Sequence, residues 1–425
     1  MTWRGTDWHR KQVEDMIYAG IDVILPVYWE WKDELWWSQP GLENLAQALE
    51  EVRLAGQKPP AVAMFYDTNS IANLDLRAQA DRDKAYRGIE FFYQTLPRQY
   101  WAVTGEGHPV IWFYSSSPLQ GVDQGYLDDL RQRFEQDFRV RPYIVVDWDW
   151  LMRQEPVTNF DATSTWLGGG AGFSEQVATV SPGVDDRWVT SYPSHSYVPR
   201  ADGEVYRNAF AKSAICQTPW VVINSWNEYH EATDISETIQ YGRTYLDLTR
   251  ELSTAFKQGT LSVNDLLSDF KSAAQVQAVL EQEVVSSGLI LSVEEGDGAN
   301  QPVTRNDEQA RTNIEGMPYL YFNVDDGFYF NTPQQIELTI RYFDEGHGTI
   351  YLDYDAAACA SDWDVASMYK NVPIVSLSNS KSWRTASIII HDATFTGHQN
   401  GYSDFRLASY EVPQIINQVT ITKKP

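Results

Sequence analysis

The chain has 425 residues and carries 33 Lys and Arg against 58 Asp and Glu, a formal net charge of −25 at pH 7. This balance excludes nucleic acids and anionic membrane surfaces as expected partners, because both require a basic face. Hydrophobic residues make up 43% of the chain, and no apolar run is long enough to cross a membrane, so a globular protein with room for two domains is expected.

The first 257 residues alternate short apolar runs with helical patterns, which is typical of repeated βα units around a parallel sheet. The apolar runs predict strands at Ile21–Tyr28, Ala61–Tyr66, Val110–Tyr114, Tyr143–Asp147, Asp161–Trp166, Trp188–Tyr192 and Val221–Trp226. The helical patterns cover Asp7–Ala19, Leu42–Ala55, Arg82–Tyr100, Tyr126–Phe138, Glu204–Ile215 and Ser236–Phe256. Nearly continuous apolar strands suit a sheet that is buried on both faces. We therefore predict an α/β fold, a (β/α)8-type barrel, over residues 1–257.

The first strand of such a barrel is apparently absent, because the sequence opens directly on a helical pattern. Residues 1–7 are polar, so no signal peptide is expected in the sequence as it stands. An open barrel would expose an unpaired parallel edge. Either the natural chain starts earlier or another segment closes the barrel, and an earlier start would be compatible with secretion or a cell-surface location.

The second part of the chain has a different character. Residues 258–287 are polar and predict a helical connector. Residues 288–425 have the alternation and regular turn signals of an all-β sandwich. Its predicted strands are Leu289–Val293, Tyr319–Val324, Ile336–Tyr342, Gly348–Tyr354, Trp383–Ile390 and Val419–Thr422.

The stretch Trp220–Ile235 carries two carboxylates three residues apart, Glu228 and Glu231, after a short apolar run. In an extended strand, residues at this spacing point to opposite faces, so the two side chains share a cleft only if the chain turns between them. Paired carboxylates whose pKa values are pushed apart are the usual groups of glycoside hydrolysis. The alternative is a solvated pair on a helix face, which the flanking aromatic residues disfavour.

These residues also resemble a known family. The stretch Asn-Glu-Tyr-His-Glu-Ala-Thr at 227–233, followed by Tyr-Gly at 241–242 and Tyr-Leu at 245–246, is similar to the signature of the endo-α-mannosidases, glycoside hydrolase family 99. Those enzymes have Asn-Glu-Trp-His-Glu-Gly-Thr, so Tyr229 and Ala232 are departures. The resemblance extends over roughly residues 1–257 and supports the glycosidase class better than the mannose substrate.

The resemblance implies a retaining hydrolase, endo-acting on an α-linked, α-mannan-like polysaccharide. It makes Glu228 the base that takes a proton from the substrate's own 2-hydroxyl, and Glu231 the acid and then base at the leaving oxygen. This chemistry leads us to expect a desolvated Glu231 with a raised pKa, and a Glu228 that hydrogen bonds keep ionised, with Asn227 and His230 as providers.

Aromatic and polar residues cluster where the predicted strands end, which is where barrel enzymes place their active sites. Flat rings with nearby hydrogen-bonding groups suit sugars, although each ring alone could equally be packing. The predicted substrate-binding residues are Tyr28, Trp29, Tyr66, Asp67, Tyr114, Asp147, Trp148, Trp166, Tyr192, His195, Asn227 and His230. A polysaccharide or oligosaccharide is the predicted partner.

Three stretches of the sandwich, at residues 342–349, 382–386 and 400–406, resemble the galactose-binding-type jelly roll. The resemblance implies either a carbohydrate-binding module or a module that braces the barrel. No cofactor is predicted, apart from a structural calcium at residues 294–298, which lack the full ligand spacing. Two rival functions stay open: a non-catalytic carbohydrate-binding or scaffold protein with a degenerate barrel, and an endo-α-glucanase on the same fold.

Overall fold

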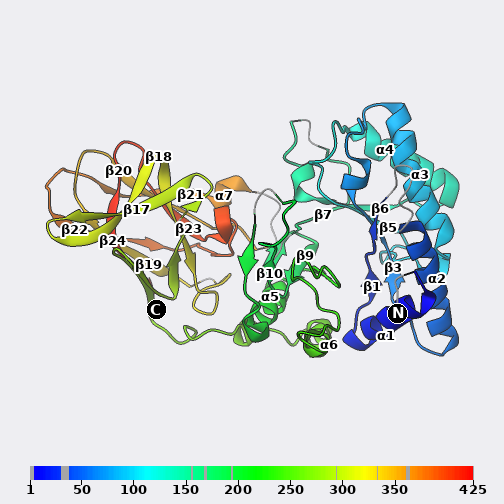
Figure 1. Cartoon of the computed structure of the whole chain (residues 1–425). Coiled ribbons are helices and arrows are strands. Elements are labelled where there is room, and N and C mark those ends of the chain that lie inside the picture. The colour runs from blue at the N-terminus through cyan, green and yellow to red at the C-terminus, as the bar shows by residue number, and fades with distance from the viewer. Residues whose placement is uncertain are drawn as a thin grey trace. The chain divides into compact units, whose positions relative to one another are not determined.

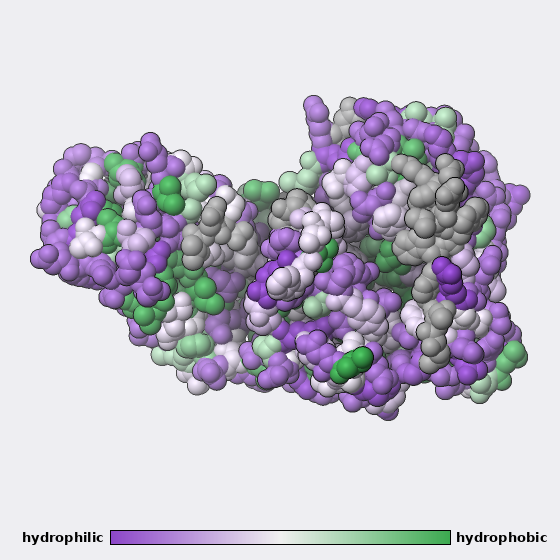
Figure 2. All heavy atoms as spheres, viewed as in Figure 1, coloured by the Kyte–Doolittle hydropathy of each residue, from purple (hydrophilic) through white to green (hydrophobic). Residues whose placement is uncertain are grey.

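A computed structural model of the chain describes residues 4–29, 38–154, 157–166, 170–192, 195–292, 294–332, 334–359 and 364–424. The chain divides into two compact units, Met1–Leu261 and Ser262–Pro425 (Figure 1). The visible surface is mostly hydrophilic (Figure 2). None of the described helices is long and apolar enough to span a membrane.

The first unit begins with parallel strands joined by helices. The strands are β1 (Val23–Ile24), β2 (Val27–Tyr28), β3 (Ala61–Val62), β4 (Met64–Tyr66), β5 (Val110–Phe113), β6 (Tyr143–Asp147) and β7 (Ala162–Ser164). β2, β4, β5, β6 and β7 are successive parallel neighbours, and β1 pairs in parallel with β3. Pro26 separates β1 from β2, since proline has no amide to donate to a ladder. The first five predicted strands are therefore present, two of them interrupted.

Successive residues of these strands face opposite sides of the sheet. On one side, Met64, Tyr66 and Phe113 belong to a core that the strands share with helices. On the other side, Phe65 and Trp112 belong to a separate cluster of buried side chains. The helices of the first core are α1 (Thr6–Ala19), α2 (Ser38–Leu54), α3 (Gln79–Thr95) and α4 (Gln124–Phe138), and the last three lie together on one side of the strands in Figure 1.

The rest of this unit contains β8 (Gly170–Phe173), β9 (Val177–Ser181), β10 (Val184–Asp185), β11 (Tyr197–Val198), α5 (Glu204–Ile215), β12 (Trp220–Ile223) and α6 (Thr244–Gln258). β12 runs parallel to β9, and β9 is antiparallel to β8. The predicted strand Trp188–Tyr192 is wrong, because these residues form turns and Trp188 is 85% exposed. The strand beside β12 is instead β9, every residue of which is buried.

The parallel strands do not close into a ring within the described ranges. No pairing joins β7 to β9, or β12 to β1 or β2, in this part of the chain. A cavity of about 1000 Å³ lies at the gap between β12 and the strands β1 and β2. Val23, Val27, Val221 and Ile223 are among the residues that line it. The unit therefore has parallel strands with helices, and the described residues do not complete the predicted eight-stranded barrel.

The second unit is a large antiparallel sandwich. Its elements are β13 (Gln275–Leu280), β14 (Val284–Ser287), β15 (Leu289–Leu291), β16 (Glu294–Glu295), β17 (Gly298–Arg305), β18 (Glu308–Val324), β19 (Ile336–Phe343), β20 (Thr349–Tyr354), α7 (Val365–Met368), β21 (Lys370–Ser376), β22 (Trp383–Ile390), β23 (Phe405–Ala408) and β24 (Ile415–Lys423). The long strand β18 pairs with β17 and β24 along its first half and with β15 and β23 along its second. β18 thereby connects the two sets of strands, which enclose one apolar core.

The predicted helical connector over 258–287 is wrong. Helix α6 ends at Gln258, a 3-10 turn covers Val263–Asp265, and β13 and β14 then form an antiparallel pair. The sequence at 275–280 alternates polar and apolar residues, and Val276, Ala278 and Leu280 are buried. This period of two is a strand pattern, which the polar composition of the segment concealed.

Candidate active site

The chain turns back on itself directly after β12. The Ser225 amide donates to the Thr233 carbonyl at 2.9 Å, and the Ile235 amide donates to the Ser225 carbonyl at 3.1 Å. Within this loop, the Ser225 hydroxyl accepts a hydrogen bond from the Glu228 amide at 3.0 Å. The Glu231 amide reaches the Glu228 carbonyl at 3.3 Å. The two carboxylates therefore lie on one tight loop at the end of the strand, as the turn predicted between them requires.

A buried arginine holds the far side of this loop. The Arg200 guanidinium donates to the carbonyls of Ala232 at 3.0 Å and Asp234 at 2.8 Å, and to the Asp234 carboxylate at 3.0 Å. It also stacks over the rings of Tyr241 and Tyr245, at 4.5 and 4.3 Å from their centroids. Ala232 has φ of +52°, a conformation that a side chain disfavours, so the loop needs such an anchor.

Each of the two glutamates has its own polar neighbour. The Tyr192 hydroxyl donates to the Glu231 carboxylate at 2.5 Å, and the His230 Nδ1 lies 3.2 Å from the Glu228 carboxylate. Burial raises the pKa of Glu228, the negative charges of Glu231 and Asp67 raise it further, and His230 opposes them. This rise in the pKa of Glu228 differs from the expectation that hydrogen bonds keep the group ionised. A raised pKa nevertheless makes a carboxylate a stronger base at the pH where it is still ionised.

Asp67 and Trp29 lie beside the pair, at the ends of β4 and β2. The Trp29 indole donates to the Asp67 carboxylate at 2.7 Å. The same carboxylate accepts the Asn69 amide at 2.9 Å and so begins the 3-10 turn Thr68–Ile71. Asp67 is close enough to Glu228 for its charge to affect the pKa of that group. The indole and the carboxylate thus form one fixed polar unit next to the candidate catalytic groups.

Tyr114 lies among the carboxylates at the end of β5. Burial, with the charges of Asp147, Asp67 and Glu231, raises the pKa of Tyr114 to about 12. Its ring meets the half-buried Trp166 edge-on, with 5.6 Å between centroids. Tyr114 therefore remains a neutral hydroxyl, which can donate one hydrogen bond in a region of negative charge.

Asp147, at the end of β6, is a buried carboxyl group with only 5% of its surface exposed. Burial and the neighbouring charge of Asp149 raise its pKa to about 7, although backbone amides of Asp149, Trp166 and Trp148 donate to it. Trp148 is half-buried in the 3-10 turn Trp148–Trp150 that follows. A carboxyl with this pKa can hold a proton near neutral pH.

Four predicted residues lie elsewhere or at the edge of this group. Tyr28 and Tyr66 are buried in the core on the helix side, where the Tyr66 hydroxyl donates to the Ala85 carbonyl at 3.1 Å. His195 is exposed, with its Nδ1 2.9 Å from the Asp186 carbonyl. Asn227 is exposed and lines the large cavity together with Glu228. The residues that the structure gathers are Trp29, Asp67, Tyr114, Asp147, Trp166, Tyr192, Glu228, His230 and Glu231, with Trp148 alongside Asp147.

Two residues that position the site were not predicted from the sequence. Arg200 anchors the loop of the glutamates, and Asp149 accepts hydrogen bonds from the Ser116 amide at 2.8 Å and the Ser115 hydroxyl at 2.7 Å. Asp149 thereby ties the loop after β5 to the end of β6. The run Asp-Trp-Asp-Trp at 147–150 was a signal for it, since it places a second carboxylate at the same strand end.

The site consists of carboxyl groups with aromatic side chains around them. In the described part of the chain, no three His, Cys, Asp or Glu side chains are grouped so that they could hold a metal ion. The site offers two carboxylates on one loop, a third carboxyl with a pKa near neutrality, and aromatic side chains around them. These groups can move protons to and from a neutral, hydroxyl-rich ligand.

Comparisons with solved structures find carbohydrate-active proteins at low identity. A glycoside hydrolase family 99 endo-α-mannosidase from Bacteroides thetaiotaomicron is 14% identical, covers 61% of this chain and 87% of its own, and has a TM-score of 0.47. A glycoside hydrolase-like protein is 13% identical, with 59% and 87% covered and a TM-score of 0.42. The C-terminal family 6 carbohydrate-binding module of a laminarinase from Zobellia galactanivorans is 16% identical, with 35% and 99% covered and a TM-score of 0.20. These TM-scores all lie below 0.5, so the function is argued from the residues themselves.

No curated protein matches the sequence. The model of the family described as Domain of unknown function (DUF5010) matches residues 2–265, which is more than half of the chain. The chain therefore belongs to the DUF5010 family.

Proposed function

We propose that the protein is a glycoside hydrolase that acts on an α-linked, mannan-like glycan, with Glu228 and Glu231 as its catalytic pair. The observation that carries the proposal is the loop after β12, which holds both carboxylates at a strand end. Tyr192 contacts one carboxylate and His230 the other. Paired carboxylates with aromatic side chains nearby are the groups that glycosidic bond cleavage requires.

The reaction uses the raised pKa of Glu228. This carboxylate accepts the proton of the substrate's 2-hydroxyl as that oxygen bonds to the anomeric carbon, and the bond from the anomeric carbon to the leaving oxygen breaks. Glu231 delivers its proton to the leaving oxygen, which departs as a hydroxyl. In the second step Glu231 takes a proton from water while the water oxygen bonds to the anomeric carbon and the bond between this carbon and the 2-oxygen breaks. Glu228 returns its proton to the 2-oxygen, so both carboxyl groups end as they began.

The Tyr192 hydroxyl positions the carboxylate of Glu231. It donates to the carboxylate at 2.5 Å and so fixes which oxygen is left for the substrate. On the other side, His230 is 3.2 Å from Glu228, and its positive charge, when protonated, keeps that base ionised to lower pH. The two glutamates thus have different neighbours, a hydroxyl donor beside Glu231 and an imidazole beside Glu228.

Glu231→Gln tests the proposal. It removes the proton that the leaving oxygen needs, so turnover of an unactivated glycan falls by at least about a hundredfold. Turnover of an aryl glycoside, whose leaving group needs no proton, falls much less in its first step. Circular dichroism of both proteins verifies that the variant folds. Activity of the folded variant close to that of the unchanged protein would refute the role of Glu231.

One observation favours a second candidate function. The edge of β12 that does not face β9 borders the cavity of about 1000 Å³, and Asn227 and Glu228 are among the residues that line it. A site that is open along one strand can bind a glycan without holding it rigidly enough for turnover. A non-catalytic carbohydrate-binding protein would bind glycans with the same affinity when Glu231 is Gln and would release no product.

A further inference from the structure

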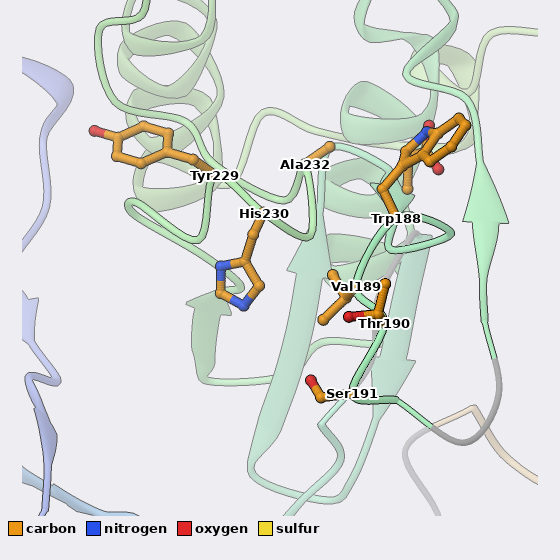
Figure 3. Close-up of a pocket in the computed structure, with 8 residues that line it drawn as sticks. Trp188, Val189, Thr190, Ser191, Tyr229, His230 and Ala232 are labelled. Carbon is orange, nitrogen blue, oxygen red and sulfur yellow. The ribbon is translucent and has the colours of Figure 1, made fainter.

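A second, smaller pocket lies next to the carboxylate pair. Its volume is about 530 Å³, and its two walls are residues 185–191 and the loop at 229–232. Figure 3 shows the His230 ring on one side and Val189, Thr190 and Ser191 on the other, with the Trp188 indole at one end. The Tyr229 ring points away from this space (Figure 3) and its hydroxyl contacts Ser236 at 2.9 Å.

Each wall of the pocket contains or adjoins a residue that contacts one of the two glutamates. His230, which lines the pocket, is also the residue in contact with the Glu228 carboxylate. Ser191 lines the pocket, and the next residue, Tyr192, donates to the Glu231 carboxylate. The Asp185 amide donates to the Glu231 carbonyl at 2.8 Å and joins the two walls at their base. The pocket therefore lies next to the residues that contact the two glutamates.

Trp188 is the unusual feature of the pocket. It is 85% exposed, whereas most of the large aromatic side chains of this unit are buried. An indole has a large flat apolar face, and one that is exposed at the surface is able to stack on a ligand. The pairing of β10 with β11 fixes the two ends of the segment that carries Trp188, and Arg187 stacks over the Tyr197 ring at 3.8 Å.

The charge and chemistry of the lining indicate the class of ligand. Asp185 is paired with Arg187 at 2.8 Å, so its charge is balanced. The other polar and aromatic side chains of the lining include the hydroxyls of Thr190 and Ser191, the His230 imidazole and the indole, and Val189 and Ala232 are apolar. Such a surface offers one flat apolar face and several hydrogen-bonding groups, and it offers no cluster of charge to hold an ionic ligand.

We propose that this pocket is a second sugar-binding subsite, in which Trp188 stacks on a neighbouring unit of the same neutral glycan chain. The inference rests on the proposed function of the carboxylate pair, and it adds that the substrate is a chain extending beyond the cleaved bond. Binding in the pocket then contributes to catalysis only for substrates long enough to reach it.

The test compares Trp188→Ala with Trp188→Phe and with Ile239→Ala, a control at a fully exposed apolar residue of the same unit. Values of kcat/KM are measured for α-linked oligosaccharides of increasing length and for an aryl glycoside of a single sugar. Trp188→Ala lowers kcat/KM for the longer chains by about tenfold or more and leaves the aryl glycoside unchanged. Trp188→Phe keeps most of the activity, and Ile239→Ala keeps all of it. Equal loss on all substrates, or no loss on any, overturns the inference.

A binding experiment separates this inference from the proposed function. Titration calorimetry measures the affinity of the longest oligosaccharide for the Glu231→Gln protein, with and without Trp188→Ala. If the unchanged protein hydrolyses nothing, the proposed function fails, but a tenfold weaker binding on loss of Trp188 still supports the subsite. Affinity that does not depend on Trp188, or no binding of any glycan, overturns it.

Discussion

Asp147 offers a test of the electrostatics of the site that needs no substrate. Burial and Asp149 raise the pKa of Asp147 to about 7, whereas a carboxyl in the unfolded chain titrates near its ordinary value. The folded protein therefore holds this proton to higher pH than the unfolded chain does. Between these two pKa values the native state binds more protons, so the stability falls as the pH rises through this window.

The magnitude follows from the two pKa values. The ordinary value of 3.8 and the folded-state value of about 7 differ by about three pH units, which corresponds to about 4 kcal/mol of lost stability at pH values above both. Of this, about 2 to 3 kcal/mol is lost between about pH 5 and about pH 8. The group is 5% exposed, so solvent screening reduces the figure little.

Asp147→Asn removes the titration and keeps the shape of the side chain. Urea unfolding is measured for both proteins at about pH 5 and about pH 8, and the change with pH is compared between them. The constant cost of replacing a carboxyl oxygen with an amide group cancels in this comparison. The variant loses about 2 to 3 kcal/mol less than the unchanged protein over this interval. The same pH dependence in both proteins would refute the buried, protonated Asp147.

Further predictions concern the loop of the glutamates. His230→Ala removes the group that lowers the pKa of Glu228, so this pKa rises further and the acidic limb of the kcat/KM profile moves to higher pH; an unmoved limb contradicts the contact. Arg200→Met leaves Asp234 buried without its partner and lowers the free energy of unfolding by about 3 to 5 kcal/mol, as urea titration measures. Adding Asp234→Leu restores part of that loss, and a double variant as unstable as the single one would show that the ion pair is not the cause.

The parallel strands were predictable where the apolar run was continuous. The side of the sheet to which each side chain points was not predictable. Phe65 and Tyr66 are neighbours in one run, yet Phe65 faces the cluster that contains Trp166, and Tyr66 faces the helices. A strand that is apolar on both sides carries no alternation to tell these faces apart. For this reason Tyr28 and Tyr66 were predicted to bind sugar, and the structure places them in the core.

The strand before β12 was mispredicted for a related reason. Residues 188–192 contain Trp, Val, Thr and Tyr, which favour strands, but their surroundings are turns and solvent. Residues 177–181 form the buried strand, and small residues among them weakened the signal. The loop that carries the two glutamates was predictable because carboxylates are residue types that perform acid–base chemistry. The residues that position the site were harder to predict, since Arg200 and Asp149 act through contacts distant in sequence.

Product analysis with Glu228→Gln and Glu231→Gln beside the unchanged protein tests the central claim most directly. Each protein, verified as folded by circular dichroism, is incubated with α-mannans, α-glucans and other polysaccharides, and released oligosaccharides are identified. The account predicts that the unchanged protein releases oligosaccharides from an α-linked glycan and that each variant releases almost none. Equal release by all three proteins, or none by the folded unchanged protein from any glycan, would contradict it.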